Sequence, residues 1–455
     1  MVFQFEVFLV LTIAQNQWLA QVQHPLRRAG FLFALVYVFI EFSGVHELIA
    51  MATGVKPYIL IVVTVPMMLL VLGSGGFQRT LRCPVAKYWI GFAIWMIISV
   101  PFSSWRGQSM FLAVSWIRAV LPILFAIAGC VMTVWEFNRL MTVLAAAAAV
   151  NVLAGRLFAN QISGRLELSG STISDPNDYA AHLILVLPFL LLVVADPRRS
   201  VVVRAVASVL AIYGLYLILS TGSRGGLLAV GVAILFCLWK LRPRQKITLA
   251  VVAAILACVA IAVLPQQVLS RFVTIFSSDN KLENDGALSA ATESAEARNY
   301  LLRQSVLVTL SHPFFGVGMG QFQNYEGEMS RKAIGGPGYW NETHNSFTQA
   351  SSEMGIPALL FYLAAIIATY RMLDRVYGLA QQQSSTPGVQ RIKVTAFYLL
   401  LSLVGFCAAS FFLSLAYRFY LPAFAGLAIA LTRAVKQSTA AAPTRSPDIA
   451  YALDQ

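Results

Sequence analysis

The sequence predicts an all-α, polytopic transmembrane helical protein with about 12 spans and one long periplasmic loop that contains short helices. Of the 455 residues, 58% are hydrophobic and only 12% are charged, a balance that would not keep a water-soluble domain of this length in solution. Apolar stretches of about 20 residues, the length that crosses a bilayer as a helix, recur from Gly30 to Thr432. A single long interruption divides them into two groups.

The spans follow one another closely before that interruption. We place them near residues 29–51, 57–73, 88–105, 110–133, 139–158, 178–195, 201–219, 224–240 and 247–265. Three more follow it, near residues 347–370, 394–413 and 416–433. Boundaries predicted from sequence alone carry an error of about 3 residues.

Four regions result from this placement: N-terminal transmembrane helices within 1–265, a loop over 266–346, C-terminal transmembrane helices over 347–433 and a cytoplasmic tail over 434–455. The tail is rich in Ala, Ser, Thr and Pro and has no apolar face to bury, so we expect disorder. Residues 1–20 are apolar with scattered polar residues and lack the pattern of a signal peptide. They either span the bilayer or lie in its interface.

Lysine and arginine mark every second short loop, which assigns those loops to the cytoplasm. The basic loops contain Arg27 and Arg28; Arg79, Arg82 and Lys87; Arg139; Arg198 and Arg199; Lys240, Arg242, Arg244 and Lys246; and Arg371, Arg375, Arg391 and Lys393. The long loop carries more acidic than basic residues and falls on the periplasmic side. The expected location is the bacterial inner membrane, with the active site facing the periplasm.

The net charge of +13 does not indicate a nucleic-acid partner, because the basic residues stand in short clusters between apolar stretches. Four of the five cysteines fall inside predicted spans, and none has metal-ligand spacing. We expect no disulfide, no metal site and no cofactor.

The first candidate for chemistry is Ser220-Thr-Gly-Ser-Arg-Gly-Gly226, a short turn between two spans. Its glycines allow a sharp turn, and Arg224 offers a planar, permanently charged fork that suits phosphate oxygens. The helix that begins near Gly225 adds the positive end of its dipole. An anion site is one interpretation, with Ser223 as a substrate-binding residue. The other is a tight turn whose arginine anchors at the lipid headgroups.

The second candidate is Thr343-His-Asn-Ser-Phe-Thr-Gln349, followed by Glu353-Met-Gly-Ile-Pro357, where the long loop re-enters the membrane. A neutral imidazole near the interface can accept a hydroxyl proton, so His344 is the base candidate and Asn345 a substrate-binding candidate. A histidine beside Asn and Ser also fits a purely structural, hydrogen-bonding role.

The third candidate lies in the stretch from Arg298 to Phe322, which includes Gly316, Gly318 and Gly320. Arg298 and Arg303 are five residues apart and therefore point about 140° apart on a helix. Arg298 is the better ligand candidate and Arg303 the weaker one. The alternative is an amphipathic helix that lies on the membrane with its arginines toward water.

Further polar residues fall on the same predicted side. Arg165 and Arg418 are substrate-binding candidates, while Asp178 is well placed to cap the helix that follows it. Glu41 and Arg118 lie inside predicted spans, where they must be paired or solvated. Their roles stay open.

Taken together, these motifs resemble those of the O-antigen ligase and O-antigen polymerase superfamily. The resemblance covers roughly residues 215–365: the Ser-Arg-Gly turn, Arg298, the segment 313–322, and His344 to Pro357. It implies a metal-independent, inverting membrane glycosyltransferase of the GT-C type, whose donor is a glycan on undecaprenyl pyrophosphate at the periplasmic face. In that reading Arg224 and Arg298 match the pyrophosphate-binding arginines. His344 matches the essential histidine, which takes or orients the acceptor proton.

The acceptor decides between two activities. A lipid A-core sugar would make the protein an O-antigen ligase, whereas a second lipid-linked repeat would make it a polysaccharide polymerase, active in lipopolysaccharide or exopolysaccharide biosynthesis. Acceptor recognition is expected in the loop segments 277–297 and 323–340, and the Asp-Pro-Asn-Asp-Tyr stretch favours the polymerase slightly. A solute transporter, which would need charged or broken helices near the midplane, and a non-catalytic scaffold are the other classes.

Overall fold

The computed structural model describes residues 20–55, 57–162, 164–168, 171–273, 286–335, 338, 340–383 and 386–440. Its first helices are α2 (Pro25–Ser43), α3 (Val45–Thr53), α4 (Ile59–Gly73), α5 (Gly76–Leu81), α6 (Pro84–Ser99), η1 (Val100–Phe102), α7 (Arg106–Ala119), α8 (Leu121–Cys130) and α9 (Val134–Leu157). A hairpin of β1 (Asn160–Ile162) and β2 (Arg165–Glu167) comes next. The expectation for residues 1–19 lies outside the described residues.

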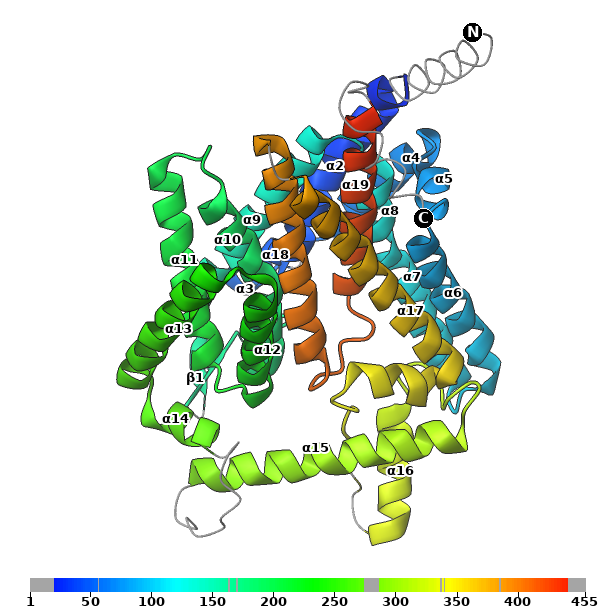
Figure 1. Ribbon diagram of the computed structural model, residues 1–455. Coiled ribbons are helices and arrows are strands. Elements are labelled where there is room, and N and C mark those ends of the chain that lie inside the picture. The colour runs from blue at the N-terminus through cyan, green and yellow to red at the C-terminus, as the bar shows by residue number, and fades with distance from the viewer. Residues whose placement is uncertain are drawn as a thin grey trace.

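The remaining helices continue the bundle and cross one of its ends (Figure 1). They are α10 (Pro176–Ala195), α11 (Val201–Ser220), α12 (Arg224–Lys240), α13 (Pro243–Val263), α14 (Gln266–Val273), α15 (Gly286–Ser311), α16 (Phe322–Ile334), α17 (Ser346–Gln382), α18 (Pro387–Ser410) and α19 (Tyr420–Ala440). The predicted all-α, polytopic class is confirmed, and the short antiparallel hairpin is its one departure among the described residues.

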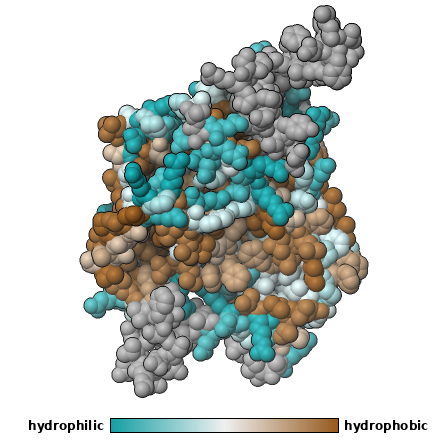
Figure 2. All heavy atoms as spheres, viewed as in Figure 1, coloured by the Kyte–Doolittle hydropathy of each residue, from teal (hydrophilic) through white to brown (hydrophobic). Residues whose placement is uncertain are grey.

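Within the described residues, eight helices are long and apolar enough to cross a membrane, and α2 with α3 passes the same test as one span bent by 59°. A helix stands at each of the twelve predicted positions, but α4 and α12 have only 15 and 17 residues. The number of spans therefore stays a prediction. Figure 2 shows the apolar band that crosses the visible face between more hydrophilic ends.

The predicted basic loops meet at one end of the bundle, which we call the basic end. Arg27 forms a buried ion pair with Glu136, and a nitrogen of Arg433 lies 3.1 Å from the carbonyl oxygen of Arg79. Arg391 likewise reaches Asp196, 195 residues away in the sequence. Basic residues from different predicted loops therefore lie together at one end of the structure.

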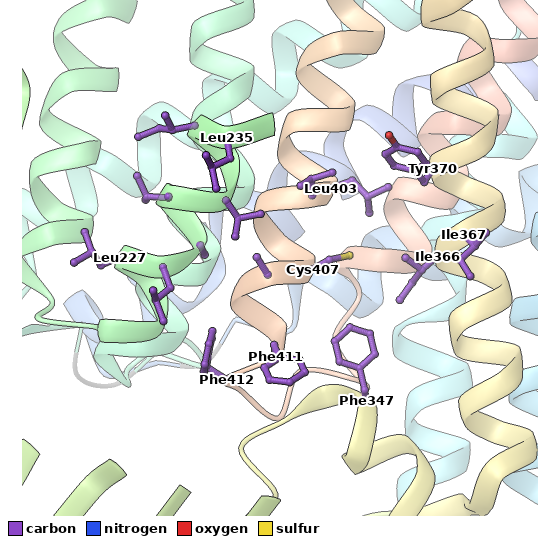
Figure 3. Close-up of a pocket in the computed structure, with 18 of the residues that line it drawn as sticks. Leu227, Leu235, Phe347, Ile366, Ile367, Tyr370, Leu403, Cys407, Phe411 and Phe412 are labelled. Carbon is purple, nitrogen blue, oxygen red and sulfur yellow. The ribbon is translucent and has the colours of Figure 1, made fainter. Parts of the chain in front are cut away.

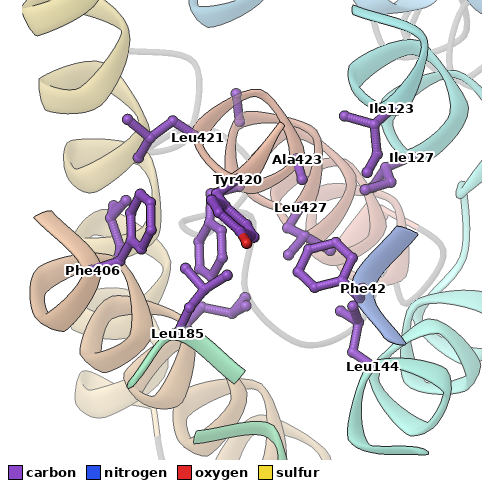
Figure 4. Packing of buried hydrophobic residues seen from close by; sticks show 14 of the residues in the cluster. Phe42, Ile123, Ile127, Leu144, Leu185, Phe406, Tyr420, Leu421, Ala423 and Leu427 are labelled. Carbon is purple, nitrogen blue, oxygen red and sulfur yellow. The ribbon is translucent and has the colours of Figure 1, made fainter. Parts of the chain in front are cut away.

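The opposite end, which we call the site end, carries the hairpin, α14, α15 and the start of α17 (Figure 1). Side chains of α2, α9, α10, α18 and α19 form the core between the ends. Phe42 packs edge-on against Phe189 and Phe419, and Figure 4 shows the same region with Phe406 and Tyr420. This tight packing holds the helices that present the site.

Two expectations about element length need correction. The long loop holds the short helices α14 and α16, as expected, but the segment around Arg298 belongs to α15, which has 26 residues and crosses the site end of the bundle (Figure 1). A loop with few Gly and Pro residues in this stretch permits one continuous helix. At the other terminus, α19 runs to Ala440, past the predicted end at 433, and residues 441–455 of the tail lie outside the described residues.

Candidate active site

The turn between α11 and α12 sets the position of Arg224. Gly222 has a φ of +60°, which glycine adopts without steric cost. The hydroxyl oxygen of Ser223 then accepts a hydrogen bond from the backbone N–H of Gly226 at 3.1 Å and caps α12. Arg224 is the first residue of α12, so its positively charged side chain leaves the backbone at the end of the helix where the dipole is also positive.

Arg165, on β2, joins this turn to α10. Its Nε donates to the carbonyl oxygen of Thr221 at 2.9 Å, and its Nη2 donates to the side-chain oxygen of Asn177 at 3.1 Å. Asp175, and not Asp178 as predicted, is the N-cap of α10, because its carboxylate accepts the backbone N–H of Asn177 at 2.7 Å. Asp178 lies in the first turn and faces Arg418 at 3.8 Å.

Arg271 is a member of the site that sequence reasoning missed. It lies on α14, and its Cδ would be 3.4 Å from a Cβ added at Gly222, while Cγ of Arg165 would be 3.7 Å from it. The arginine stems therefore line the turn from two sides. A single cation in an amphipathic stretch after a span has no distinguishing pattern, so only the fold brings Arg271 to this place.

Arg298, on α15, completes a cluster of four arginines with Arg165, Arg224 and Arg271, which we call the site arginines. Burial, the largest cause, and the positive charge of Arg271 together lower the pKa of Arg165 to about 10. Burial also lowers the pKa of Arg298, and Arg224 lies within electrostatic range of both Arg298 and Arg271. Like charges crowd here, which favours an anionic ligand.

Arg303 lies farther along α15 and is exposed, whereas Arg298 is half-buried. This matches the expected divergence of the two side chains. A role for Arg303 in substrate binding stays a prediction.

His344 lies directly before α17 in an unusual backbone conformation. Its φ is +49°, the one positive φ of a non-glycine residue in the described chain. Its backbone N–H donates to the hydroxyl of Ser414 at 2.9 Å, which helps to hold this conformation. Burial lowers the pKa of the His344 imidazole below its ordinary value of 6.5, and the charge of Arg298 lowers it further. At neutral pH the ring is therefore uncharged and can accept a proton.

Consecutive residues at the start of α17 form hydrogen bonds to the segment 411–419, which connects α18 with α19. Asn345 caps α17 by accepting the N–H groups of Phe347 and Thr348, and its Nδ2 donates to the carbonyl of Phe411 at 2.9 Å. The hydroxyl of Ser346 donates to the carbonyl of Leu413 at 2.6 Å. These contacts fix the backbone on both sides of His344. Contact of Asn345 or Ser223 with substrate stays a prediction.

Glu353 ties the long loop to the same framework. Its carboxylate accepts the Tyr417 hydroxyl at 2.6 Å and the backbone N–H of Gly320 at 2.7 Å. The helix breaks two residues later at Gly355, whose φ is +82°.

The segment 313–320 docks into this break, and we call it the loop anchor. Backbone N–H groups of Val317 and Gly318 donate to the carbonyls of Ser352 and Glu353 at 3.0 and 2.7 Å. A Cβ at Gly316 would stand 2.3 Å from the carbonyl carbon of Glu353. Close backbone contact therefore explains Gly316, whereas a Cβ at Gly318 or Gly320 would clash with the side chain of Ser103 or Leu112.

Other predicted residues lie apart from the site arginines. Arg418 donates to the carbonyl of Thr172 at 3.0 Å and ties the α18–α19 connection to the segment before α10. Glu41 is half-buried on α2 and Arg118 is exposed on α7, and their roles stay open. Among the described residues, no group of three or more His, Cys, Asp and Glu side chains could hold a metal ion.

A long apolar groove begins next to the site, between α12, α17 and α18. Phe347, Phe411 and Phe412 line its site end, and its wall continues along α17 to Tyr370 (Figure 3). Its volume is about 1120 Å³. A second apolar cavity, of about 640 Å³, lies on the other side of α12 against α11 and α13, with Leu269 and Phe272 of α14 in its wall. Both cavities therefore border elements that carry site arginines.

Residues 206–363 match the family model described as O-antigen ligase. This confirms the resemblance that the motifs predicted, because the matched segment contains Arg224, Arg298 and His344. The chain is also 25% identical over 305 residues to the teichuronic acid biosynthesis protein TuaE of Bacillus subtilis, an alignment that covers 63% of this chain and 60% of the relative. The chain is thus similar to the O-antigen ligase family over residues 206–363 and to a protein of teichuronic acid biosynthesis.

Proposed function

We propose that this protein transfers a glycan from undecaprenyl pyrophosphate to the hydroxyl of an acceptor sugar at the periplasmic face of the inner membrane. The observation that carries the proposal is the meeting of the site arginines and His344 at one end of an apolar groove. A donor of this class has a long hydrocarbon chain, a pyrophosphate and a glycan in a row. The apolar groove fits the hydrocarbon chain and the site arginines fit the pyrophosphate, and we place the glycan near His344.

The chemistry is a direct displacement at the anomeric carbon. The acceptor oxygen forms a bond to that carbon, the bond from carbon to the pyrophosphate oxygen breaks, and the lipid pyrophosphate departs with the electron pair. Arg224 and Arg298, with Arg165 and Arg271, stabilise the negative charge that develops on the leaving group. His344 accepts the proton of the attacking hydroxyl. Attack from the side opposite the leaving group inverts the anomeric centre.

Four fixed positive charges supply the stabilisation that a divalent cation would otherwise give, so the proposed reaction is metal-independent. Purified protein in detergent, supplied with a pyrophosphate-linked oligosaccharide and an acceptor, should elongate the acceptor equally well with and without EDTA. Transfer that stops with EDTA and returns with Mg²⁺ would contradict metal independence. If no glycan is transferred and the protein instead drives uptake of the substrate into vesicles, the protein is a transporter and not a glycosyltransferase.

The second apolar cavity offers room for the hydrocarbon chain of an acceptor lipid on the far side of α12. Both the carrier lipid of a polymerase acceptor and the lipid A of a ligase acceptor have such chains, so the cavity does not decide between the two activities. The deciding experiment is a deletion strain complemented with wild type or His344→Asn, followed by gel analysis of lipopolysaccharide and secreted polymer. Single repeats that accumulate on the carrier lipid indicate a polymerase, whereas long lipid-linked polymer without capped lipopolysaccharide indicates a ligase. Unchanged glycans in the His344→Asn strain would exclude both the polymerase and the ligase and would favour a non-catalytic scaffold.

A further inference from the structure

A separate cavity with charged residues in its wall lies at the basic end, opposite the site. Its volume is about 430 Å³, and it opens between α9, the turn from α10 to α11, and the first two turns of α18. Residues 196–199, with Asp196, Arg198 and Arg199, form one wall, and Pro387, Gly388 and Arg391 form another. Neither the proposed transfer nor the matched family segment accounts for this cavity.

Three guanidinium groups of the cavity share one carboxylate. Nη2 of Arg391 lies 3.2 Å from Asp196 Oδ2, Nε of Arg198 lies 3.4 Å from Oδ1, and Nε of Arg199 lies 3.9 Å from Oδ2. Each guanidinium has five N–H donors, whereas a carboxylate offers about four acceptor positions. Three positive charges against one negative charge leave the cavity electropositive, with donors in excess.

The start of α18 adds to this positive field. Thr386 caps the helix by accepting the backbone N–H of Val389, and Pro387 occupies the first helical position. A Cβ added at Gly388 would meet nothing within 4 Å, so the backbone of the first turn borders open space. The positive end of a 24-residue helix therefore reinforces the arginine side chains.

The remaining wall of the cavity is apolar. Met141, Leu192, Val193 and Val394 form this wall, behind the polar rim of arginines. A small soluble anion has no apolar part to bury against this wall. A phospholipid has one, because the first carbons of its acyl chains, next to the glycerol, can pack there. Basic pockets between helices on the cytoplasmic side of membrane proteins bind anionic lipid headgroups in this way.

From this arrangement we infer that the cavity at the basic end binds the phosphate headgroup of an anionic phospholipid, held by Arg199 and Arg391 above an apolar wall. Asp196 competes with the phosphate for the same guanidinium groups. The occupancy therefore depends on the balance between one protein carboxylate and one lipid phosphate. This site is independent of glycan transfer at the other end.

Two substitutions of opposite expected effect test the inference. Removing the Arg391 fork weakens the site, so Arg391→Gln should lower the affinity for phosphatidylglycerol by about tenfold, the loss expected for one charge-assisted contact. Removing the competitor should do the reverse, so Asp196→Asn should raise the affinity by about tenfold. Arg28→Gln, which neutralises an exposed arginine on α2 outside the cavity, is the matched control and should leave the affinity unchanged.

The measurement is native mass spectrometry of the full chain, titrated with phosphatidylglycerol, phosphatidylcholine or inorganic phosphate, with the thermal midpoint of unfolding as a check of folding. Selective binding of phosphatidylglycerol that falls in Arg391→Gln and rises in Asp196→Asn supports the inference. Binding that is equal for all variants overturns the cavity as the site. Binding of inorganic phosphate with the same affinity as the lipid overturns the lipid as its occupant. None of these outcomes depends on transferase activity.

Discussion

Two clusters of arginines stand at opposite ends of the bundle and differ in what they bind. At the basic end, Arg27, Arg79 and Arg433 come from three helices and donate to the carbonyl oxygens of Cys130, Gly129 and Ala128. These are the last three residues of α8, whose carbonyls have no partner within the helix. Each of these three residues, which we call the capping arginines, therefore donates a hydrogen bond to a carbonyl oxygen at the C-terminal end of α8.

Among the site arginines, Arg165 also reaches a helix end, because Thr221, whose carbonyl oxygen accepts its Nε–H, is the C-cap of α11. Arg165 donates to Thr221 and Asn177, but the nearby acidic group, Asp175, is already engaged in capping α10. Mutual repulsion contributes to the lowered pKa values of Arg165 and Arg298. The same residue type therefore caps one helix at the basic end, whereas at the site end it gathers positive charge from four elements in one place, as the proposed anionic substrate requires.

The sharpest test of this comparison removes the proposed base at the site end. His344→Asn keeps a residue that tolerates positive φ but cannot accept the proton, so we expect transfer to fall by about 10²- to 10⁴-fold. The thermal midpoint of unfolding should stay close to that of the wild type. Steady-state transfer assays and thermal unfolding in detergent check both parts, and a variant that retains full activity would remove His344 from the mechanism.

A substitution among the capping arginines should have the opposite profile. Arg27→Ala leaves Glu136 as an unpaired buried charge, which costs roughly 3–5 kcal/mol of folding free energy. Arg28→Ala, the exposed neighbour, is the control. We expect a lower yield and a lower thermal midpoint for Arg27→Ala alone, with the remaining folded protein as active per molecule as the wild type. Loss of specific activity without loss of stability would break the distinction between the clusters.

Arg271 extends the comparison to a residue found only through the fold. We expect Arg271→Gln to lower kcat/KM for the lipid-linked donor by about tenfold to a hundredfold, because one charged donor near the leaving group is lost. Arg156→Gln, an exposed arginine in the last turn of α9, is the matched control. Equal effects of the two substitutions would mean that Arg271 contributes only general surface charge.

The smallest expected effect concerns pH. The proposed base works only when neutral, so activity should decline as pH falls through the pKa of His344, which lies below 6.5. Arg298 contributes to that lowering, and Arg298→Gln should therefore move the acidic limb of the residual pH–rate profile to higher pH. An unchanged limb, or a shift to lower pH, would contradict the electrostatic coupling of the two residues.

Hydropathy and motif order predicted a helix at each expected span, the two ends and four residues of the candidate site, Arg165, Arg224, Arg298 and His344, because these features are local in sequence. The roles of these four residues stay predictions. Arg271 could not be predicted, since its neighbours in space come from residues 165 and 222. The cap at Asp175 was assigned to Asp178 because both acidic residues precede an apolar run, and only backbone geometry separates them. The docking of Gly316 and Gly318 against α17 likewise depends on a helix break that the pattern does not reveal.

The loop anchor separates the two halves of the long loop. The ring of Phe315 stacks with those of Trp95 and Phe102, so the anchor is also fixed to α6 and η1. On one side of it lies α15 with Arg298, and on the other lies α16. The anchor also joins the two halves, because Val317 packs in one buried cluster with Leu301 and Val308 of α15 and Phe322 of α16. The Tyr300 hydroxyl of α15 donates to the Glu326 carboxylate of α16 at 2.9 Å. A change in α16 therefore reaches the helix that carries Arg298.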